Sequence, residues 1–383
     1  MKILQLVSSM HAGGAERVAA TLVNAWAARG DAVTLMPTYS SKGSCFYPVD
    51  DAVDLVWLAD LAGKGAGPLR SLARLRALRR HVRALRPDVV VSFLTNVNVA
   101  AILAVAGQGI PVIVCERTNP AVAGNAGRLL RLARALTYPR ADIVTVQAQA
   151  TVEPFRALVP RIRRLEVVPN PLPPELGGNP PPPSGDDGGG RRRLAAMGRL
   201  VPDKQFDLLI DVFAELAPAH PAWDLTIWGE GPEREPLEAR IARHGLQGRA
   251  RLAGRTGTPW EQLAASQAFV LTSAVEGFPN VLLESMALGL PCVSFDCPSG
   301  PREMTRDGRD ALLVPAGDRA GLAAALGRVL ADDGLRGELG ARAAVSVRER
   351  YALPAVLARW DALFESVGAR PPEQASSGRE GRP

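Results

Sequence analysis

The chain has 383 residues, of which 47% are hydrophobic and 22% are charged, a composition typical of a globular protein and unlike that of disordered or collagen-like chains. At roughly 150 residues per domain, this length predicts two domains. The cysteines Cys45, Cys115, Cys292 and Cys297 lack the spacing of a disulfide framework or a metal site. Together with an N-terminal apolar run too short for a signal peptide, this spacing indicates a cytoplasmic protein in a reducing compartment.

The net charge of +6 is unevenly distributed along the chain. Residues 1–180 carry 21 Lys or Arg against 12 Asp or Glu, a net +9, whereas residues 181–383 carry 24 against 27, a net −3. The segment between Asp60 and Asp88 has no acidic residue and seven arginines: Arg70, Arg74, Arg76, Arg79, Arg80, Arg83 and Arg86. Such a concentration of positive charge favours an anionic partner.

Short apolar runs alternate with longer helix-like segments in the first part of the chain. The runs expected to form strands are Ile3–Val7, Ala32–Met36, Leu55–Leu58, Val89–Leu94, Val112–Cys115, Ile143–Val146 and Leu165–Val168. This alternation is typical of parallel strands joined by crossover helices. It stops at a Pro/Gly-rich linker, expected over residues 171–193, that contains four consecutive prolines, Pro180–Pro183.

The alternation resumes after the linker. Strands are expected at Leu194–Met197, Leu225–Trp228, Ala250–Leu252, Phe269–Thr272, Cys292–Phe295 and Leu312–Val314. We therefore predict an α/β protein with two Rossmann-like domains, residues 1–170 and residues 194–350. A final helix is expected within residues 351–368, and a disordered tail over residues 369–383.

In open parallel sheets, ligands bind at the carboxyl ends of the strands, so chemistry is expected in the loops that follow them. After the first strand, Gly13 and Gly14 open a helix, where glycines let a phosphate or sugar approach backbone N–H groups. A double glycine also occurs in simple tight turns, and this alternative stays open. The loop lacks the G-x-G-x-x-G pattern and no acidic residue ends the second strand, which disfavours a nicotinamide-dependent enzyme.

A basic pair follows the first strand after the linker. Arg199 lies just beyond the strand, and Lys204 precedes an amphipathic helix. A guanidinium fork and an ammonium at a helix entrance suit a diphosphate group. Lys204 is the only lysine after residue 64, which makes it the stronger candidate, although a solvated surface pair remains the alternative.

The most specific stretch follows the expected strand Phe269–Thr272. Glu276 lies in the loop and Glu284 inside the next helix, eight residues later. The residues expected at the N-terminus of that helix are Gly277, Phe278, Pro279 and Asn280. Their N–H groups can face sugar hydroxyls or phosphate, and a carboxylate such as Glu284 can accept a pair of ribose hydroxyls.

These motifs resemble those of glycosyltransferase family 4, a family of retaining enzymes with the GT-B fold. Two further stretches share the resemblance, Gly229-Glu230-Gly231-Pro232 and Cys297-Pro298-Ser299-Gly300-Pro301-Arg302-Glu303, so that it covers nearly the whole chain. The resemblance implies two Rossmann-like domains that face each other across a cleft, and a C-terminal helix that crosses back to the N-terminal domain.

The resemblance also implies roles for single residues at the donor. Arg199 and Lys204 would neutralise the donor diphosphate, while Glu276 and the backbone of residues 277–280 would hold the transferred sugar. Glu284 would bind the ribose, and Gly13 and Gly14 would approach the donor. The base-binding loop would contain Gly254 and Arg255.

One segment departs from the family pattern. Many members have a His after the strand that corresponds to Val112–Cys115, whereas this chain has Glu116 and Arg117 there. A subset of the family that builds lipid-linked oligosaccharides and polysaccharide precursors has a similar pair. Glu116 and Arg117 are therefore the candidates for contact with the acceptor, and which of them makes it stays open.

The expected substrates follow from the resemblance: a nucleoside-diphosphate sugar, with UDP as the expected nucleotide, and a glycan acceptor linked to a polyprenyl diphosphate. No Asp-x-Asp motif occurs, so we expect no metal and no other cofactor, because the basic pair would replace Mg²⁺. Helical spacing of leucines from Leu69 to Leu85 predicts one apolar face in the Arg-rich segment. Its arginines, Arg76, Arg79, Arg80 and Arg83, are expected to hold the anionic acceptor at the inner face of the cytoplasmic membrane. The alternative is a solvated helix that only packs on the domain by its leucine face.

Other functions remain open on the sequence alone. A sugar-nucleotide epimerase of the same fold would convert a donor without any acceptor. A non-enzymatic protein of the membrane surface would use the Arg-rich helix but would not need Arg199, Lys204 and the paired glutamates. Nucleic-acid binding is disfavoured, because four tyrosines provide little capacity for base stacking.

Overall fold

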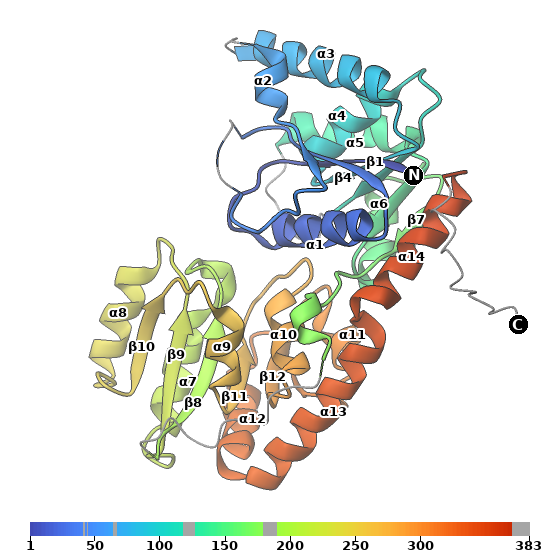
Figure 1. Ribbon diagram of the computed structural model, residues 1–383. Helices are drawn as coiled ribbons and strands as arrows, with labels where there is room; N and C mark the ends of the chain where they lie inside the picture. The colour runs from blue at the N-terminus through green and yellow to red at the C-terminus, as the bar shows by residue number, and fades with distance from the viewer. Residues whose placement is uncertain (41–42, 44, 64–66, 118–126, 179–189, 370–383) are drawn as a thin grey trace, which may run out of the picture.

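The computed structural model describes residues 1–40, 43, 45–63, 67–117, 127–178 and 190–369. Two parallel sheets, one of seven strands and one of six, form the centres of two domains that lie one above the other in Figure 1. The prediction of two parallel-sheet α/β domains is confirmed.

The N-terminal sheet has the strand order β3-β2-β1-β4-β5-β6-β7. Its strands are β1 (Lys2–Val7), β2 (Ala32–Pro37), β3 (Asp54–Leu55), β4 (Val89–Phe93), β5 (Val112–Cys115), β6 (Ile143–Val146) and β7 (Leu165–Val167). The helices described in this domain are α1 (Gly14–Ala28), α2 (Leu58–Ala62), α3 (Gly67–Leu85), α4 (Thr95–Val105), α5 (Arg128–Thr137) and α6 (Val152–Leu158). The break in strand order between β1 and β4 is the kind of switch point at which ligands bind.

The C-terminal sheet has the order β10-β9-β8-β11-β12-β13. Its strands are β8 (Arg192–Met197), β9 (Trp223–Trp228), β10 (Ala250–Gly254), β11 (Ala268–Leu271), β12 (Cys292–Asp296) and β13 (Leu312–Pro315). Its helices are α7 (Phe206–Leu216), α8 (Arg234–Arg243), α9 (Pro259–Ala264), α10 (Asn280–Ala287), α11 (Pro301–Met304), α12 (Arg319–Ala331) and α13 (Asp333–Tyr351). The order changes between β8 and β11, so this sheet has a switch point of its own.

The central strands are mostly apolar, because helices cover both faces of each sheet; Ser92 of β4 and Thr145 of β6 are buried polar exceptions. Strands β4, β5, β6 and β11 are buried at every residue. Continuous apolar runs of this kind are the reason that the sequence located the strands closely.

Two segments differ from their expected structure. Of the run Leu55–Leu58, only Leu55 belongs to a strand, and Leu58 begins α2; the run is apolar because Trp57 and Leu58 pack into the core from a turn and a helix. The expected linker contains two core residues, Leu172 and Leu176, which are buried in the C-terminal domain. The prolines Pro180–Pro183 and residues 370–383 lie outside the described residues.

The last helix, α14 (Leu353–Ser366), crosses back to the N-terminal domain, as Figure 1 shows. Trp360 packs edge-on against Trp26 of α1 with ring centroids 5.8 Å apart, and Phe364 lies 5.5 Å from the same ring. Arg29, just after α1, donates a hydrogen bond of 2.6 Å to Asp361. The predicted crossover is confirmed, and it ties the end of the chain to the domain where the chain begins.

Candidate active site

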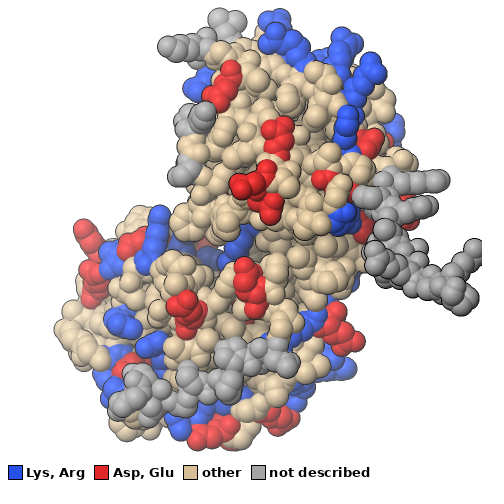
Figure 2. Space-filling model, in the orientation of Figure 1, with Lys and Arg blue, Asp and Glu red and all other residues tan. Residues whose placement is uncertain are grey.

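The two domains face each other with α1 along the side of the N-terminal domain nearest the C-terminal domain (Figure 1). The face drawn in Figure 2 is hollowed between the domains, and Lys or Arg side chains lie at the hollow. A cavity of about 920 Å³ opens at one side of this interface, between residues after β6, such as Gln147, and the loop after β12, including Ser299 and Gly300. Of the stretches singled out by the sequence, residues 297–303 contribute to the lining of this cavity.

The paired glycines permit a close approach across this cleft. A Cβ atom placed on Gly14 would lie 3.0 Å from Nδ2 of Asn280, the first residue of α10. Glu16 folds back so far that a Cβ on Gly13 would collide with its carboxylate, which also accepts a hydrogen bond of 2.9 Å from Ser9. The glycines thus bring the start of α1 against the predicted sugar-binding loop, which is more than a tight turn requires.

Lys204 and Glu276 form an ion pair, with 2.5 Å between Nζ and Oε1. Ser273 donates a further hydrogen bond of 2.7 Å to the same Glu276 oxygen. Both side chains of the ion pair are largely buried. Arg199 is exposed and has no ion pair among the described residues. The structure therefore brings the predicted diphosphate ligand Lys204 to the predicted sugar ligand Glu276.

The Gly229-Glu230-Gly231 stretch packs closely against the loop that carries Arg199. A Cβ on Gly229 would lie 1.8 Å from the carbonyl oxygen of Gly198, and one on Gly231 would lie 2.2 Å from that of Leu200. Backbone hydrogen bonds join the same loops, because the N–H of Gly198 donates to Trp228 and that of Leu200 to Glu230. The glycines let the loop after β9 pack directly against the backbone on either side of Arg199.

The expected base-binding loop lies next to a separate ion pair. Gly254 has a φ of +77°, and a Cβ there would lie 3.2 Å from Oε1 of Glu230. Arg234 pairs with Glu230 at 2.8 Å, and Arg255 is exposed at the rim. This loop follows β10, at the end of the sheet farthest from β12 and β13.

Glu284 is held by partners from both domains. Its Oε1 pairs with Nη2 of Arg17 on α1, and its Oε2 accepts a hydrogen bond of 3.0 Å from Nε1 of Trp260. Burial raises the pKa of the Glu284 carboxyl, while Arg17 and Trp260 oppose this shift. The sequence analysis assigned no role to Arg17, which lies 267 positions before Glu284, or to Trp260, which lies 24 positions before it.

The other residues of the predicted sugar loop contribute through the backbone. Phe278 is buried and packs its ring 6.0 Å from that of Tyr351, so its side chain belongs to the core. Pro279 lies against Gly300, where a Cβ would come within 2.7 Å of its Cδ atom. These contacts fix the loop. Pro279 has no N–H, and the N–H of Asn280 donates to the carbonyl of Phe278 at 2.9 Å, so the predicted backbone contact to the sugar falls to Gly277 and Phe278.

Arg117 connects the domains through a chain of amides. Its Nη1 donates to Oδ1 of Asn170 at 2.6 Å, and Nδ2 of Asn170 donates to Oδ1 of Asn280 at 2.8 Å. The guanidinium lies 3.5 Å from the ring centroid of Phe93. Burial lowers the pKa of Arg117 to about 10. Arg117 is thus linked through Asn170 to Asn280 at the sugar loop. The predicted contact of Arg117 with the acceptor requires a position near this loop.

Glu116 faces away from Arg117 into the N-terminal domain. It is 1% exposed and accepts hydrogen bonds from Thr95 and from the hydroxyl of Tyr138. Burial raises the pKa of this carboxyl. Of the two candidates for contact with the acceptor, Glu116 lies within the core of the N-terminal domain, and Arg117, 8% exposed, lies between the domains. The contact of Arg117 with the acceptor stays a prediction.

The Arg-rich helix α3 divides its arginines between two roles. Arg76, Arg80 and Arg83 are exposed, and Figure 2 shows basic side chains gathered over this edge of the N-terminal domain. Arg79 instead donates hydrogen bonds to the carbonyls of Ala104 and Ala106 at the end of α4, at 2.9 and 2.7 Å. Arg79 is therefore a poor candidate for acceptor binding, because its guanidinium is already committed to α4.

Helix α5 carries an exposed apolar stripe that the sequence analysis missed. Leu129, Leu132 and Leu136 are 84%, 57% and 59% exposed, and their spacing places them on one face of the helix. Arg128 and Arg131 are exposed on the same helix. The spacing of these leucines is the signal that could have revealed the stripe.

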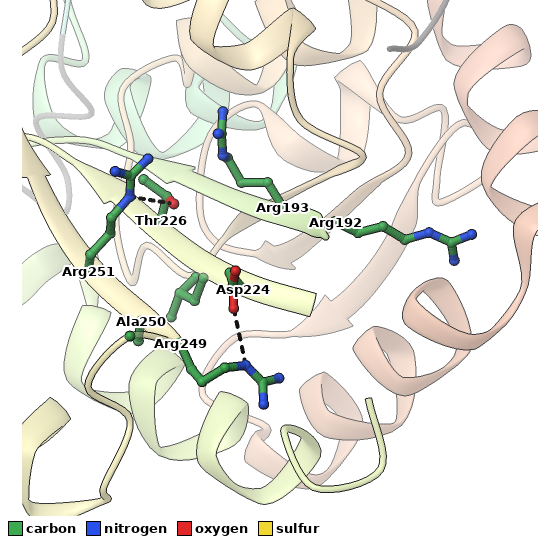
Figure 3. A pocket seen from close by; sticks show the side chains of 9 residues that line it. Arg192, Arg193, Asp224, Thr226, Arg249, Ala250 and Arg251 are labelled. Carbon is green, nitrogen blue, oxygen red and sulfur yellow. Dashed lines mark hydrogen bonds and ion pairs between the residues drawn. The ribbon is translucent and has the colours of Figure 1, made fainter. Parts of the chain in front are cut away.

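A second cavity, of about 370 Å³, lies at the opposite end of the C-terminal sheet, where β8, β9 and β10 begin. Figure 3 shows that several arginines line it and that Arg249 points to Asp224. Arg249 pairs with Asp224 at 3.1 Å, and Arg192 pairs with Asp333 at 2.9 Å. This cavity is remote from the carboxyl ends of the strands and is not the site built by the predicted motifs.

Within the part of the chain that the structure describes, no three His, Cys, Asp or Glu side chains gather in a way that could hold a metal ion. In the same residues, no helix is both long enough and apolar enough to cross a bilayer.

Comparison with known families identifies the two Rossmann-like domains as those of a glycosyltransferase. The N-terminal domain matches the family described as "Glycosyl transferase 4-like domain" over residues 13–171, and the C-terminal domain matches "Glycosyl transferases group 1" over residues 191–332. The chain belongs to glycosyltransferase family 4, as the resemblance of its motifs indicated.

Curated relatives are similar over most of this chain. An exopolysaccharide phosphotransferase of Streptomyces coelicolor is 30% identical over 94% of this chain, which spans only 40% of that relative's length. An α-1,4-N-acetyl-D-galactosaminyltransferase of Campylobacter jejuni, whose name gives a glycan on PP-undecaprenol, is 28% identical over 88% of this chain and 91% of its own length. The amylovoran biosynthesis glycosyltransferase AmsD of Erwinia amylovora is 27% identical over 95% of this chain and 99% of its own length.

Solved structures share the fold at low sequence identity. Anabaena HepE in complex with UDP superposes with a TM-score of 0.81 at 19% identity, over 96% of this chain and 100% of that chain. The lipopolysaccharide outer core galactosyltransferase WaaB superposes with a TM-score of 0.72 at 21% identity, over 96% of this chain and 100% of its own. The GT-B architecture is thereby confirmed.

Proposed function

We propose that this protein is a retaining glycosyltransferase that moves a hexose or N-acetylhexosamine from a UDP-sugar to a glycan acceptor on a polyprenyl diphosphate. The reaction would serve polysaccharide or lipid-linked glycan biosynthesis. The observation that carries the proposal is the contact between Lys204 and Glu276, in a loop that Gly14 approaches from the other domain. The UDP complex of HepE and the PP-undecaprenol substrate of the Campylobacter relative support the choice of donor and acceptor.

In this mechanism the acceptor hydroxyl attacks the anomeric carbon on the face from which UDP departs. The bond from the acceptor oxygen to the anomeric carbon forms as the bond to the β-phosphate oxygen breaks, and the hydroxyl proton passes to the leaving phosphate. Negative charge grows on that phosphate, so Arg199, Lys204 and the N–H groups of the sugar loop stabilise the transition state more than the ground state. Glu276 orients the sugar, and no metal takes part.

The acceptor would approach along the N-terminal domain, at the cytoplasmic face of the membrane. The exposed face of α3 carries Arg76, Arg80 and Arg83, and α4 lies between α3 and α5. Cationic side chains near an anionic bilayer contribute about 1 kcal/mol each, and exposed leucines such as those of α5 add apolar contact at the interface. We assign this surface to anionic lipid, including the diphosphate of the acceptor.

A nucleotide screen by thermal unfolding tests the donor assignment. At about 100 times its dissociation constant, a ligand stabilises the folded state by roughly 2.7 kcal/mol, so UDP and its sugars should raise the Tm more than GDP, ADP or CDP do. Absence of a shift with UDP would contradict the proposal. Conversion of a UDP-sugar to an isomer without acceptor would favour the epimerase alternative.

A further inference from the structure

Arg17 and Glu284 belong to different domains, and their ion pair crosses the cleft. Arg17 lies in the first turns of α1, the helix that Figure 1 shows along the cleft side of the N-terminal domain. Glu284 lies in α10, behind the predicted sugar loop. The pair therefore joins the two halves of the molecule at the position assigned to the donor ribose.

The carboxylate is the fixed member of this pair. Its side chain is 3% exposed, against 20% for Arg17, and Leu283 and Met286 of the same helix are buried beside it. Trp260 holds the second carboxylate oxygen at 3.0 Å. A buried carboxylate without a partner is costly, so Glu284 needs a cation or a set of hydroxyl donors at all times.

Arg17 and a ribose diol both use the acceptor sites of the Glu284 carboxylate. The structure has Arg17 on Oε1 and Trp260 on Oε2, so each oxygen already accepts from one of the roughly two donors it can take. A ribose diol that takes the site on Oε1 facing α1 displaces the more exposed of these two partners. That group is Arg17, because a long side chain at the surface of α1 moves more readily than a buried helix or an indole in contact with it.

We propose that Arg17 competes with the donor ribose for Glu284, so that an interdomain salt bridge closes the empty site and donor binding breaks it. This inference rests on the proposed role of Glu284 as the ribose ligand. After transfer, Arg17 regains Glu284 and speeds the release of UDP. Arg17 is a positioning residue in this scheme, since it acts through Glu284 and does not contact the reacting atoms.

Isothermal titration with UDP and with 2′,3′-dideoxy-UDP tests the competition. If the pair is formed in about nine of ten donor-free molecules, its loss in Arg17→Ala should tighten UDP binding about tenfold. The dideoxy nucleotide lacks the hydroxyls that replace Arg17. Its affinity for Arg17→Ala should therefore stay within about twofold of its affinity for wild type. In the Glu284→Gln background, Arg17→Ala should have little further effect, because the two residues act through one interaction.

Arg29→Ala is the matched control, since Arg29 follows the same helix and pairs with Asp361 of α14 but lies away from Glu284. It should leave UDP affinity unchanged. Arg17→Lys provides a second variant if Arg17→Ala does not fold. It keeps the positive charge but loses the planar guanidinium, so its affinity for UDP should lie between those of wild type and Arg17→Ala.

Equal or weaker UDP binding by the Arg17 variants would overturn the competition, and so would equal tightening of both nucleotides. Failure of the underlying ribose assignment has a different signature. In that case wild type does not bind UDP, or Arg17→Ala with Glu284→Gln binds UDP as well as Arg17→Ala alone does.

Discussion

The basic pair is the part of the site that single substitutions test most simply. Arg199→Ala and Lys204→Ala should each lower transfer by about two orders of magnitude, because each removes a charge-assisted contact that strengthens as the phosphate leaves. Steady-state kinetics with the folded variants measures this loss. Arg243→Ala, an exposed arginine of the same domain, is the control, and near-wild-type turnover of either test variant would remove that residue from the site.

The two glutamates should separate donor binding from turnover. Glu284→Gln should mainly weaken donor binding, because an amide accepts ribose hydroxyls less strongly than a carboxylate. Glu276→Gln should lower kcat more than affinity, since its contact is to the sugar being transferred. Titration calorimetry beside kinetics distinguishes these effects, and wild-type values in both variants would exclude Glu276 and Glu284 from the site.

Glu116 makes a prediction for stability against pH. Its folded-state pKa is raised from 4.5 by burial, so its favourable contribution is fully present below the unfolded-state pKa and is lost as the pH rises through the folded-state value. Glu116→Gln cannot ionise and keeps an acceptor for Thr95 and Tyr138. The fall in Tm from pH 4.5 to pH 8 should therefore be smaller in the variant, and an unchanged fall would show that Glu116 is not the source.

At the scale of the element, α3 can be tested without disturbing its packing. Arg76, Arg80 and Arg83 are exposed along one face, so the triple substitution to Glu should leave folding intact. It should abolish co-sedimentation with anionic liposomes and reduce transfer to a lipid-linked acceptor more than to a short soluble one. Arg79 is left unchanged, because it holds the end of α4.

The control for α3 has the same change in net charge on the other domain. Arg243, Arg309 and Arg328 are exposed there, and their substitution to Glu should leave liposome binding largely intact. Equal loss of liposome binding in the two triple variants would show that net charge, and not the position of the arginines on α3, determines membrane binding.

The elements also show which features the sequence could predict. Strands such as β5 were located because a strand buried on both faces must be apolar throughout. The residues Leu55–Leu58 were misjudged, because the burial of Trp57 and Leu58 gives the same apolar run without a strand. Arg79 and Arg83 lie on the same helix, but Arg79 bonds to the end of α4 whereas Arg83 is exposed. The local sequence around these arginines does not predict this tertiary contact.

The site was predictable to a similar degree. Glycines, Lys204 and the two glutamates carry their own spacing and follow strands, so their positions in the cleft could be inferred. Arg17 meets Glu284 only when the two domains come together, and Trp260 meets it only when α9 packs against α10. No spacing within one motif contains this information. The different surroundings of Glu116 and Arg117 likewise depend on distant partners, Tyr138 for Glu116 and Asn170 for Arg117.

At the scale of the whole molecule, α14 couples the domains. Trp360 is 1% exposed and packs on Trp26, so Trp360→Ala should destabilise the N-terminal domain by about 3–5 kcal/mol. Urea unfolding should show an earlier transition for this domain. The exposed neighbour Arg359 provides the control variant, and an unchanged midpoint for Trp360→Ala would contradict the crossover as a source of stability.

The central claim is acceptor-dependent, retaining transfer from a UDP-sugar without a metal. The most direct measurement is the NMR spectrum of the product made from an α-linked UDP-sugar and a polyprenyl-diphosphate-linked glycan, with EDTA present. We predict an α-anomeric product, formed together with UDP only when the acceptor is added. A β-anomeric product, activity that returns only with Mg²⁺, or consumption of the donor without acceptor would contradict the account.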